Sequence, residues 1–142
     1  MTSLRFRGPV LPDGEARDLY VVDGRITLEA ATGAETAAEG WIVPGLVDAH
    51  CHVGLDANGA VDEATTEEQA LADRDAGSLL LRDCGSPADT RWVQDREDLP
   101  RLIRCGRHIA RTRRYIRNFA HEIEPGDITA YVAQEEIGRA HV

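Results

Sequence analysis

The sequence has no lysine and a shortage of positive charge. All 16 of its basic residues are arginine, and they face 25 acidic residues, which leaves a net charge of −9. This deficit argues against a general nucleic-acid-binding protein, which usually presents a basic face. No apolar run approaches the roughly 20 residues of a membrane span, and residues 1–12 lack the apolar core of a secretory signal. We therefore expect neither a nucleic-acid nor a membrane partner.

Cysteine is scarce and widely spaced. Cys51, Cys84 and Cys105 form no C-x-x-C pair, and their odd number does not fit a disulfide framework. Reduced thiols in the cytoplasm suit this pattern better. The remaining composition, 42% hydrophobic and 29% charged over 142 residues, is typical of a folded chain of one domain or slightly more.

The first 45 residues are expected to form a small β unit. Asp23-Gly24 between two β-prone runs is a strong signal for a type I′ hairpin. The small, acidic residues 30–40 are expected to form a loop. Short strands are expected at residues 4–7, 19–22, 25–28 and 41–43. Because a lone hairpin is marginally stable in water, this unit is too small to close a sandwich alone.

After residue 45 the pattern changes to alternating strands and helices. Strands are expected at 46–53, 78–82 and 102–109, and helices at 65–75 and 89–97. This order indicates βαβ units with a parallel sheet, so the fold class is α/β. The mostly apolar run 46–53 predicts a strand buried on both faces.

His50 and His52 end this first strand and are the most informative pair in the chain. Residues i and i+2 of a strand point to the same face, with Cα atoms about 6.6 Å apart. Two imidazoles leaning inward across this gap can bind one Zn²⁺ ion. Cys51 points to the other face and is a poor candidate for the same metal. In a chain without further signals, such a pair is also typical of packing residues.

Three motifs resemble the amidohydrolase superfamily, in its imidazolonepropionase-like and prolidase-like branch. Residues 40–52, GWIVPGLVDAHCH, are similar to the end of the family's first barrel strand. Residues 76–85, AGSLLLRDCG, resemble the second strand, and residues 99–107, LPRLIRCGR, the third. The resemblance covers nearly the whole chain. It implies the first strands and helices of a (β/α)₈ barrel, preceded by strands of a small composite β-sandwich.

The resemblance also implies a chemistry. His50 and His52 would be metal ligands, most simply for Zn²⁺, and Asp48, Arg82 and Asp83 would have structural or supporting roles next to them. As an alternative, Asp48 is an ordinary carboxylate at a turn or strand end with no role in the site. Likewise, Arg82 and Asp83 form only a local ion pair at the end of their strand. The implied reaction is hydrolysis of a carbon–nitrogen bond in a small-molecule amide or cyclic amide by a metal-activated water.

The chain is too short to supply the whole barrel. Only 97 residues follow Gly45, whereas a (β/α)₈ barrel typically needs about 250. The family's later ligands and its general base are not recognisable here, and a carboxylated lysine is impossible in a lysine-free chain. We therefore expect an N-terminal fragment without a catalytic residue of its own. The alternative is an inactive fragment or a small, weak metal-binding module.

The C-terminal end carries a further signal. Residues 136–142, EIGRAHV, match the translation of a common sequencing-library adapter, which makes a non-native tail the favoured interpretation over a short helix end with a glycine cap. The expected organisation is therefore a partial sandwich at 1–45, a partial barrel at 46–135 and a non-native tail at 136–142.

An arginine-rich segment at 111–121 remains without a firm role. A solvated face is the simplest interpretation, and the net negative charge argues against a nucleic-acid patch. A loop at the mouth of the site, in which an arginine or His121 holds a substrate carboxylate, is the third alternative.

Overall fold

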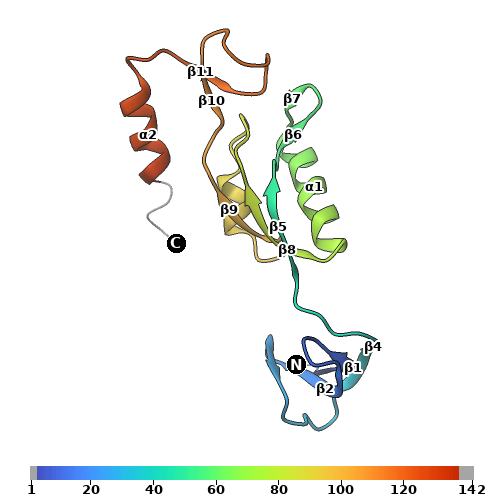
Figure 1. Ribbon diagram of the computed structural model, residues 1–142. Coiled ribbons are helices and arrows are strands. Elements are labelled where there is room, and N and C mark those ends of the chain that lie inside the picture. Colours follow the sequence, from blue (N-terminus) through green and yellow to red (C-terminus); the bar gives the residue numbers. More distant parts are fainter. Residues whose placement is uncertain (1–2, 138–142) are drawn as a thin grey trace. The chain divides into compact units, whose positions relative to one another are not determined.

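The computed structural model describes residues 3–137 and divides the chain into two compact units, Met1–Pro44 and Gly45–Val142 (Figure 1). The predicted tail falls mostly outside the described residues. Of its seven positions only residues 136 and 137 are described, and they end the last helix.

The first unit is a four-stranded sheet in the order β3-β2-β1-β4. β1 pairs antiparallel with β2, which in turn pairs antiparallel with β3, whereas β4 runs parallel to β1. The backbone φ angles of Asp23 and Gly24 are 50° and 74°, as a type I′ turn requires, so the predicted hairpin is confirmed. The strand bounds are β1 (Leu4–Val10), β2 (Glu15–Val22), β3 (Arg25–Thr27) and β4 (Glu35–Glu39).

Two expectations for this unit were wrong. Residues 30–40, expected to form a loop, contain β4. The five residues of β4 are small or acidic and all exposed, so its sequence does not alternate between apolar and polar residues. The strand expected at 41–43 is reduced to a single bridge between Ile42 and Val10. The absence of a side chain at Gly8 lets β1 lie close to Gly40, which follows β4. A Cβ atom at position 8 would lie 1.9 Å from the carbonyl oxygen of Gly40.

The second unit is built on a parallel sheet of three strands in the order β5-β8-β9. α1 connects β5 to β8, so the predicted βαβ arrangement is confirmed. The three strands point toward the β6–β7 hairpin and the β10–β11 pair in Figure 1. The principal bounds are β5 (Leu46–Cys51), α1 (Glu63–Asp75), β8 (Ser78–Asp83) and β9 (Arg101–Arg104).

Shorter elements follow the carboxyl ends of these strands. A hairpin follows β5, a 3₁₀ helix precedes β9, and a two-stranded parallel pair precedes the last helix. Their bounds are β6 (Leu55–Asp56), β7 (Gly59–Ala60), η1 (Arg91–Asp95), β10 (Ile109–Arg111), β11 (His121–Ile123) and α2 (Ile128–Ile137).

Three boundaries differ from expectation for local reasons. α1 begins two residues early because Asp62, rather than a threonine, is its N-cap, with its carboxylate accepting the backbone N–H of Thr65 at 2.8 Å. The helix expected at 89–97 is only the short η1. The strand expected at 102–109 is interrupted near Gly106, where φ is 92°.

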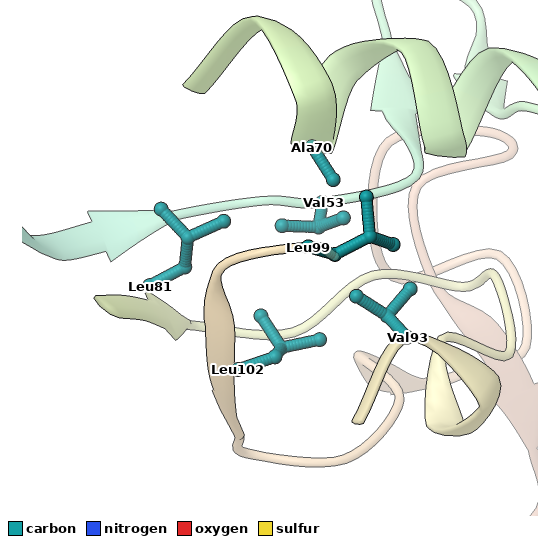
Figure 2. Packing of buried hydrophobic residues seen from close by; sticks show 6 residues of the cluster. All are labelled: Val53, Ala70, Leu81, Val93, Leu99 and Leu102. Atoms are coloured by element: carbon teal, nitrogen blue, oxygen red, sulfur yellow. The ribbon is translucent and has the colours of Figure 1, made fainter. Parts of the chain in front are cut away.

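A small apolar core lies between the sheet, α1 and η1 (Figure 2). Leu81 at the centre of β8 is 0% exposed, and Trp92 packs against the cluster from its edge. The buried members are Val53, Ala70, Leu81, Val93, Leu99 and Leu102. β5 is not buried on both faces as expected, because Leu46 and Val47 are 56% and 59% exposed. Closure into a barrel stays a prediction.

Candidate functional site

The two histidines of the H-x-H motif lie side by side at the carboxyl end of β5. Their ring centroids are 5.4 Å apart and the ring planes meet at 74°. Both residues are exposed. Cys51, between them, packs instead against the apolar core on the opposite side of the strand. The alternation of a β-strand therefore places both imidazoles on the open face of the sheet.

His52 is held in one orientation by a contact with the neighbouring strand's loop. Its Nδ1 atom lies 2.6 Å from the carbonyl oxygen of Gly85, which follows β8. A carbonyl oxygen can only accept, so this contact requires the proton on Nδ1 and leaves the lone pair of Nε2 available. A histidine that binds a metal commonly has this arrangement, with its other ring nitrogen donating to a carbonyl or carboxylate. His52 therefore fits the role of a metal ligand.

The histidine pair supplies only part of a metal site. Within residues 3–137, no group of three or more histidine, cysteine, aspartate or glutamate side chains is placed to hold a metal ion. Zinc sites use three protein ligands and a water, or four protein ligands. The two imidazoles thus fit as two ligands of a larger set.

The carboxylate of Asp48 forms a hydrogen bond within its own strand. Its Oδ1 accepts the backbone N–H of His50 at 2.9 Å, so this carboxylate holds the backbone of His50 rather than its ring. Arg82 is exposed, whereas Asp83, the next residue on β8, is 0% exposed. The Arg82–Asp83 ion pair is not among the ion pairs of the described residues. Alternation along the strand explains this, because successive side chains point to opposite faces.

Asp83 is instead enclosed by polar groups from the loop that follows it. Its Oδ1 accepts the N–H of Gly85 at 2.9 Å, and its Oδ2 lies 3.5 Å from the hydroxyl of Thr90. Burial raises the pKa of Asp83, while the Gly85 N–H and the charge of Arg104 act in the opposite direction. The side chain predicted to support the site is thus the centre of a buried polar cluster.

Two further residues, which the sequence did not single out, hold the loop after His52. Gln69 on α1 accepts the N–H of Gly54 at 3.0 Å and donates to the carbonyl of Leu55 at 3.1 Å. The buried hydroxyl of Ser86 donates to the carbonyl of Gly54 at 3.2 Å. A Cβ atom on Gly54, whose φ is 81°, would crowd Thr66, Ala88 and Thr90 at 3.0–3.2 Å. Glutamine and serine carry no motif signal, so only the three-dimensional arrangement shows their role.

Cys51 offers a first prediction. Burial, followed by the nearby carboxylate of Asp48, raises its pKa to about 12, whereas Cys105 is exposed. The thiolate is the reactive form, so iodoacetamide at pH ~8 should modify Cys105 roughly tenfold faster than Cys51, or more. Mass spectrometry of the digested chain over time measures both rates. The difference should vanish in denaturant, and equal rates in the folded chain would contradict this placement of Cys51.

Asp89 lies at the centre of an arginine cluster beyond β8. It accepts hydrogen bonds from Arg91 and, at 3.2 Å, from Arg107, and Arg104 lies 4.0 Å away. The hydrogen bonds from Arg91 are the main reason that the pKa of Asp89 is held well below its ordinary value, and Arg107 adds to the effect. A lowered folded-state pKa stabilises the fold above the unfolded value, near pH ~3.9, and this stabilisation is lost as the pH falls below it.

Asp89→Asn should therefore lower stability in a pH-dependent manner. At pH ~7 we expect a loss of at most about 1 kcal/mol, because the carboxylate is partly screened by solvent. The difference from the wild-type chain should shrink as the pH falls below ~3.9, because the carboxylate is then protonated in the unfolded chain and the fold gains less from keeping it ionised. Thermal melts at several pH values measure this. Asp95→Asn, at the exposed end of η1, is the matched control, and an Asp89→Asn effect that grows on acidification would refute the prediction.

His121 lies on β11, far from the histidine pair in the sequence. Its ring stacks on Tyr131 with centroids 5.0 Å apart. The cavity of about 440 Å³ beside it is lined by carboxylates as well, among them Glu124 and Asp127, and by neither His50 nor His52. An acidic lining disfavours the substrate carboxylate that we considered for His121. The arginines of 111–117 are all exposed.

The chain is similar in sequence to two mycobacterial proteins. Uncharacterized proteins of Mycobacterium tuberculosis (strain H37Rv) and Mycobacterium bovis are each 55% identical to it over 134 residues. The match covers 93% of this chain but 36% of each relative, so the chain spans about a third of their length. No family model matches the sequence.

Solved structures share its fold at low sequence identity. An uncharacterized protein matches with a TM-score of 0.67 at 19% identity, over 96% of this chain and 43% of that one. A Xaa-Pro dipeptidase with methionine bound in its active site matches with a TM-score of 0.65 at 14% identity, over 96% and 45%. Molinate hydrolase matches with a TM-score of 0.55 at 18% identity, over 97% and 39%. The chain thus has the fold of part of these larger proteins, two of which are named for hydrolysis.

Among residues 3–137, no helix is both long and apolar enough to cross a lipid bilayer.

Proposed function

We propose that this chain is the amino-terminal part of a metal-dependent hydrolase of the amidohydrolase superfamily, acting on carbon–nitrogen bonds of small-molecule amides. The observation that carries the proposal is the histidine pair on the open face of β5, with Nδ1 of His52 anchored on the Gly85 carbonyl at 2.6 Å. The resemblance of residues 40–52 to the family motif and the shared fold with two hydrolases support it.

His50 and His52 would hold a divalent cation, and Zn²⁺ is among the metals that imidazole ligands suit. When bound, such an ion supplies Lewis-acid activation of a water molecule and of the scissile carbonyl. The carbonyl of Gly85 then orients the ring of His52, whereas Asp48 holds only the backbone of His50 through its N–H. The remaining ligands and the general base would come from strands of a (β/α)₈ barrel, and the four-stranded sheet of the first unit would belong to the composite sandwich beside it.

Two measurements test the proposal. Calorimetric titration of the 142-residue chain should show binding of Zn²⁺, and the longer mycobacterial relative, assayed with dipeptides, N-acyl amino acids and cyclic amides, should hydrolyse members of this panel in a metal-dependent manner. A chain that binds no Zn²⁺, or a relative that is inactive on every amide with metal present, would refute it.

A small metal-binding module without turnover is the second candidate. It is favoured by the absence of a third ligand next to the pair within residues 3–137. Zn²⁺ binding by the chain together with an inactive relative would support the module. Hydrolysis by the 142-residue chain itself would refute both the module and the view that the general base lies elsewhere.

A further inference from the structure

The Gly85 carbonyl that anchors His52 belongs to a turn whose flanking residues form backbone hydrogen bonds, from the Cys84 N–H to the Cys51 carbonyl at 2.9 Å and from the His108 N–H to the Ser86 carbonyl at 3.1 Å. Gly85 has a φ of 108°, a conformation that glycine tolerates and that leaves the turn several alternatives. The buried carboxylate of Asp83 removes this freedom by accepting the Gly85 N–H at 2.9 Å. One peptide group of Gly85 therefore points its N–H at Asp83, and the next directs its carbonyl at Nδ1 of His52.

The Asp83 carboxylate is itself held by a second pair of side chains. Arg104 on β9, with 7% of its side chain exposed, donates its Nε–H to the hydroxyl of Thr90 at 2.9 Å. Because the Thr90 oxygen accepts this bond, its own proton is free to point at Oδ2 of Asp83, 3.5 Å away. Thr90 and Asp83 are 1% and 0% exposed, so water does not compete for these groups. A buried carboxylate that lost its hydrogen-bond partners would be strongly destabilising. Asp83 therefore keeps its contacts with Gly85 and Thr90, and these contacts define the geometry of the cluster.

We propose that Asp83, supported by Thr90 and Arg104, is a positioning residue that fixes the Gly85 carbonyl and thereby the Nδ1–H tautomer of His52. The consequence for binding, that Nε2 faces the metal, rests on the proposed function. The tautomer itself does not, since it is a property of the chain without metal. Three neighbouring strands contribute to this arrangement: His52 directly follows β5, Asp83 ends β8 and Arg104 ends β9.

Nuclear magnetic resonance of the chain labelled with ¹⁵N-histidine tests the tautomer directly. Long-range ¹H–¹⁵N spectra at pH ~8, above the ordinary histidine pKa of about 6.5, distinguish a ring protonated on Nδ1 from one protonated on Nε2. His52→Gln identifies the signal, since the chain has five histidines. The Nδ1–H form is expected for His52 in the wild-type chain. An Nε2–H majority in the wild-type chain would overturn the inference without any further variant.

A matched pair at position 83 tests the positioning role. Asp83→Ala removes the acceptor of the Gly85 N–H, and His52 should then change to an Nε2–H majority, with Zn²⁺ affinity falling by about 10–100-fold, as when an outer partner of a metal-binding histidine is lost. Asp83→Asn keeps an oxygen for the same N–H. It should retain the Nδ1–H form and lose less than about tenfold in affinity. A wild-type tautomer in Asp83→Ala would overturn the inference.

A second pair covers the case in which Asp83→Ala does not fold. Thr90→Val keeps the shape of the side chain but removes the hydroxyl, and it should shift the tautomer toward Nε2–H. Thr90→Ser keeps the hydroxyl and should not. The same spectrum from both variants would refute the role of Thr90 and Arg104. If the chain binds no Zn²⁺ but the tautomers change as expected, the proposed function fails while the positioning role stands.

Discussion

Replacement of His52 with alanine is expected to lower the affinity of the chain for Zn²⁺ by at least about 100-fold. Loss of an outer partner of a metal-binding histidine already costs 10–100-fold, and this substitution removes the ligand itself. His50→Ala should have an effect of similar size, because the two rings lie 5.4 Å apart and would share the ion. Isothermal titration calorimetry of the wild-type and variant chains measures the difference.

His121→Ala is the matched control for this experiment. It also removes an exposed histidine, but one that lies on β11 and stacks on Tyr131. Its Zn²⁺ affinity should equal that of the wild-type chain. Equal losses in all three variants would show that binding is unspecific, and an unchanged affinity in His52→Ala would contradict the assignment of the site.

Leu81→Ala is expected to destabilise the second unit by about 2–5 kcal/mol, the usual cost of emptying a fully buried leucine site. Leu81 is 0% exposed at the centre of β8, and only six buried hydrophobic residues form the described cluster. A loss of this size is a large part of the 5–15 kcal/mol that stabilises a typical domain. Urea denaturation followed by the fluorescence of Trp92, which packs against the cluster, reports on this unit.

Leu79→Ala provides the comparison within the same strand. Leu79 is two residues away on β8 and 52% exposed, so its truncation should cost less than about 1 kcal/mol. A Trp41→Phe background removes the second tryptophan, which lies in the first unit and would add an unrelated signal. Similar midpoints for Leu81→Ala and Leu79→Ala would contradict the position of the core.

Local patterns predicted the elements that depend on local chemistry. The Asp23-Gly24 turn needs two residues at positive φ, which the sequence shows directly. The parallel β5-β8-β9 sheet follows from apolar runs separated by an amphipathic or capped segment. β4 could not be predicted in this way, because its exposed residues 35–39 pair with β1 through backbone hydrogen bonds that any sequence can make.

The candidate site was predictable only in part. The H-x-H spacing at His50 and His52 places two imidazoles on one face of any strand. The residues that orient His52 could not be predicted from this spacing, because they are distant from it in the sequence. Gly85 is 33 positions from His52, and Arg104 is 14 positions from Thr90. These contacts depend on the register between neighbouring strands, which the pattern of one strand does not contain.

The spatial order β5-β8-β9 is also the order in which these strands leave the ribosome. Each newly made strand finds its neighbour already present, and the helix or turn that precedes it is short enough to bring the two together. Assembly of this sheet can therefore begin during translation and proceed in one direction. In the first unit the spatial and sequence orders differ, because β4 pairs with β1 rather than with β3, the strand made just before it.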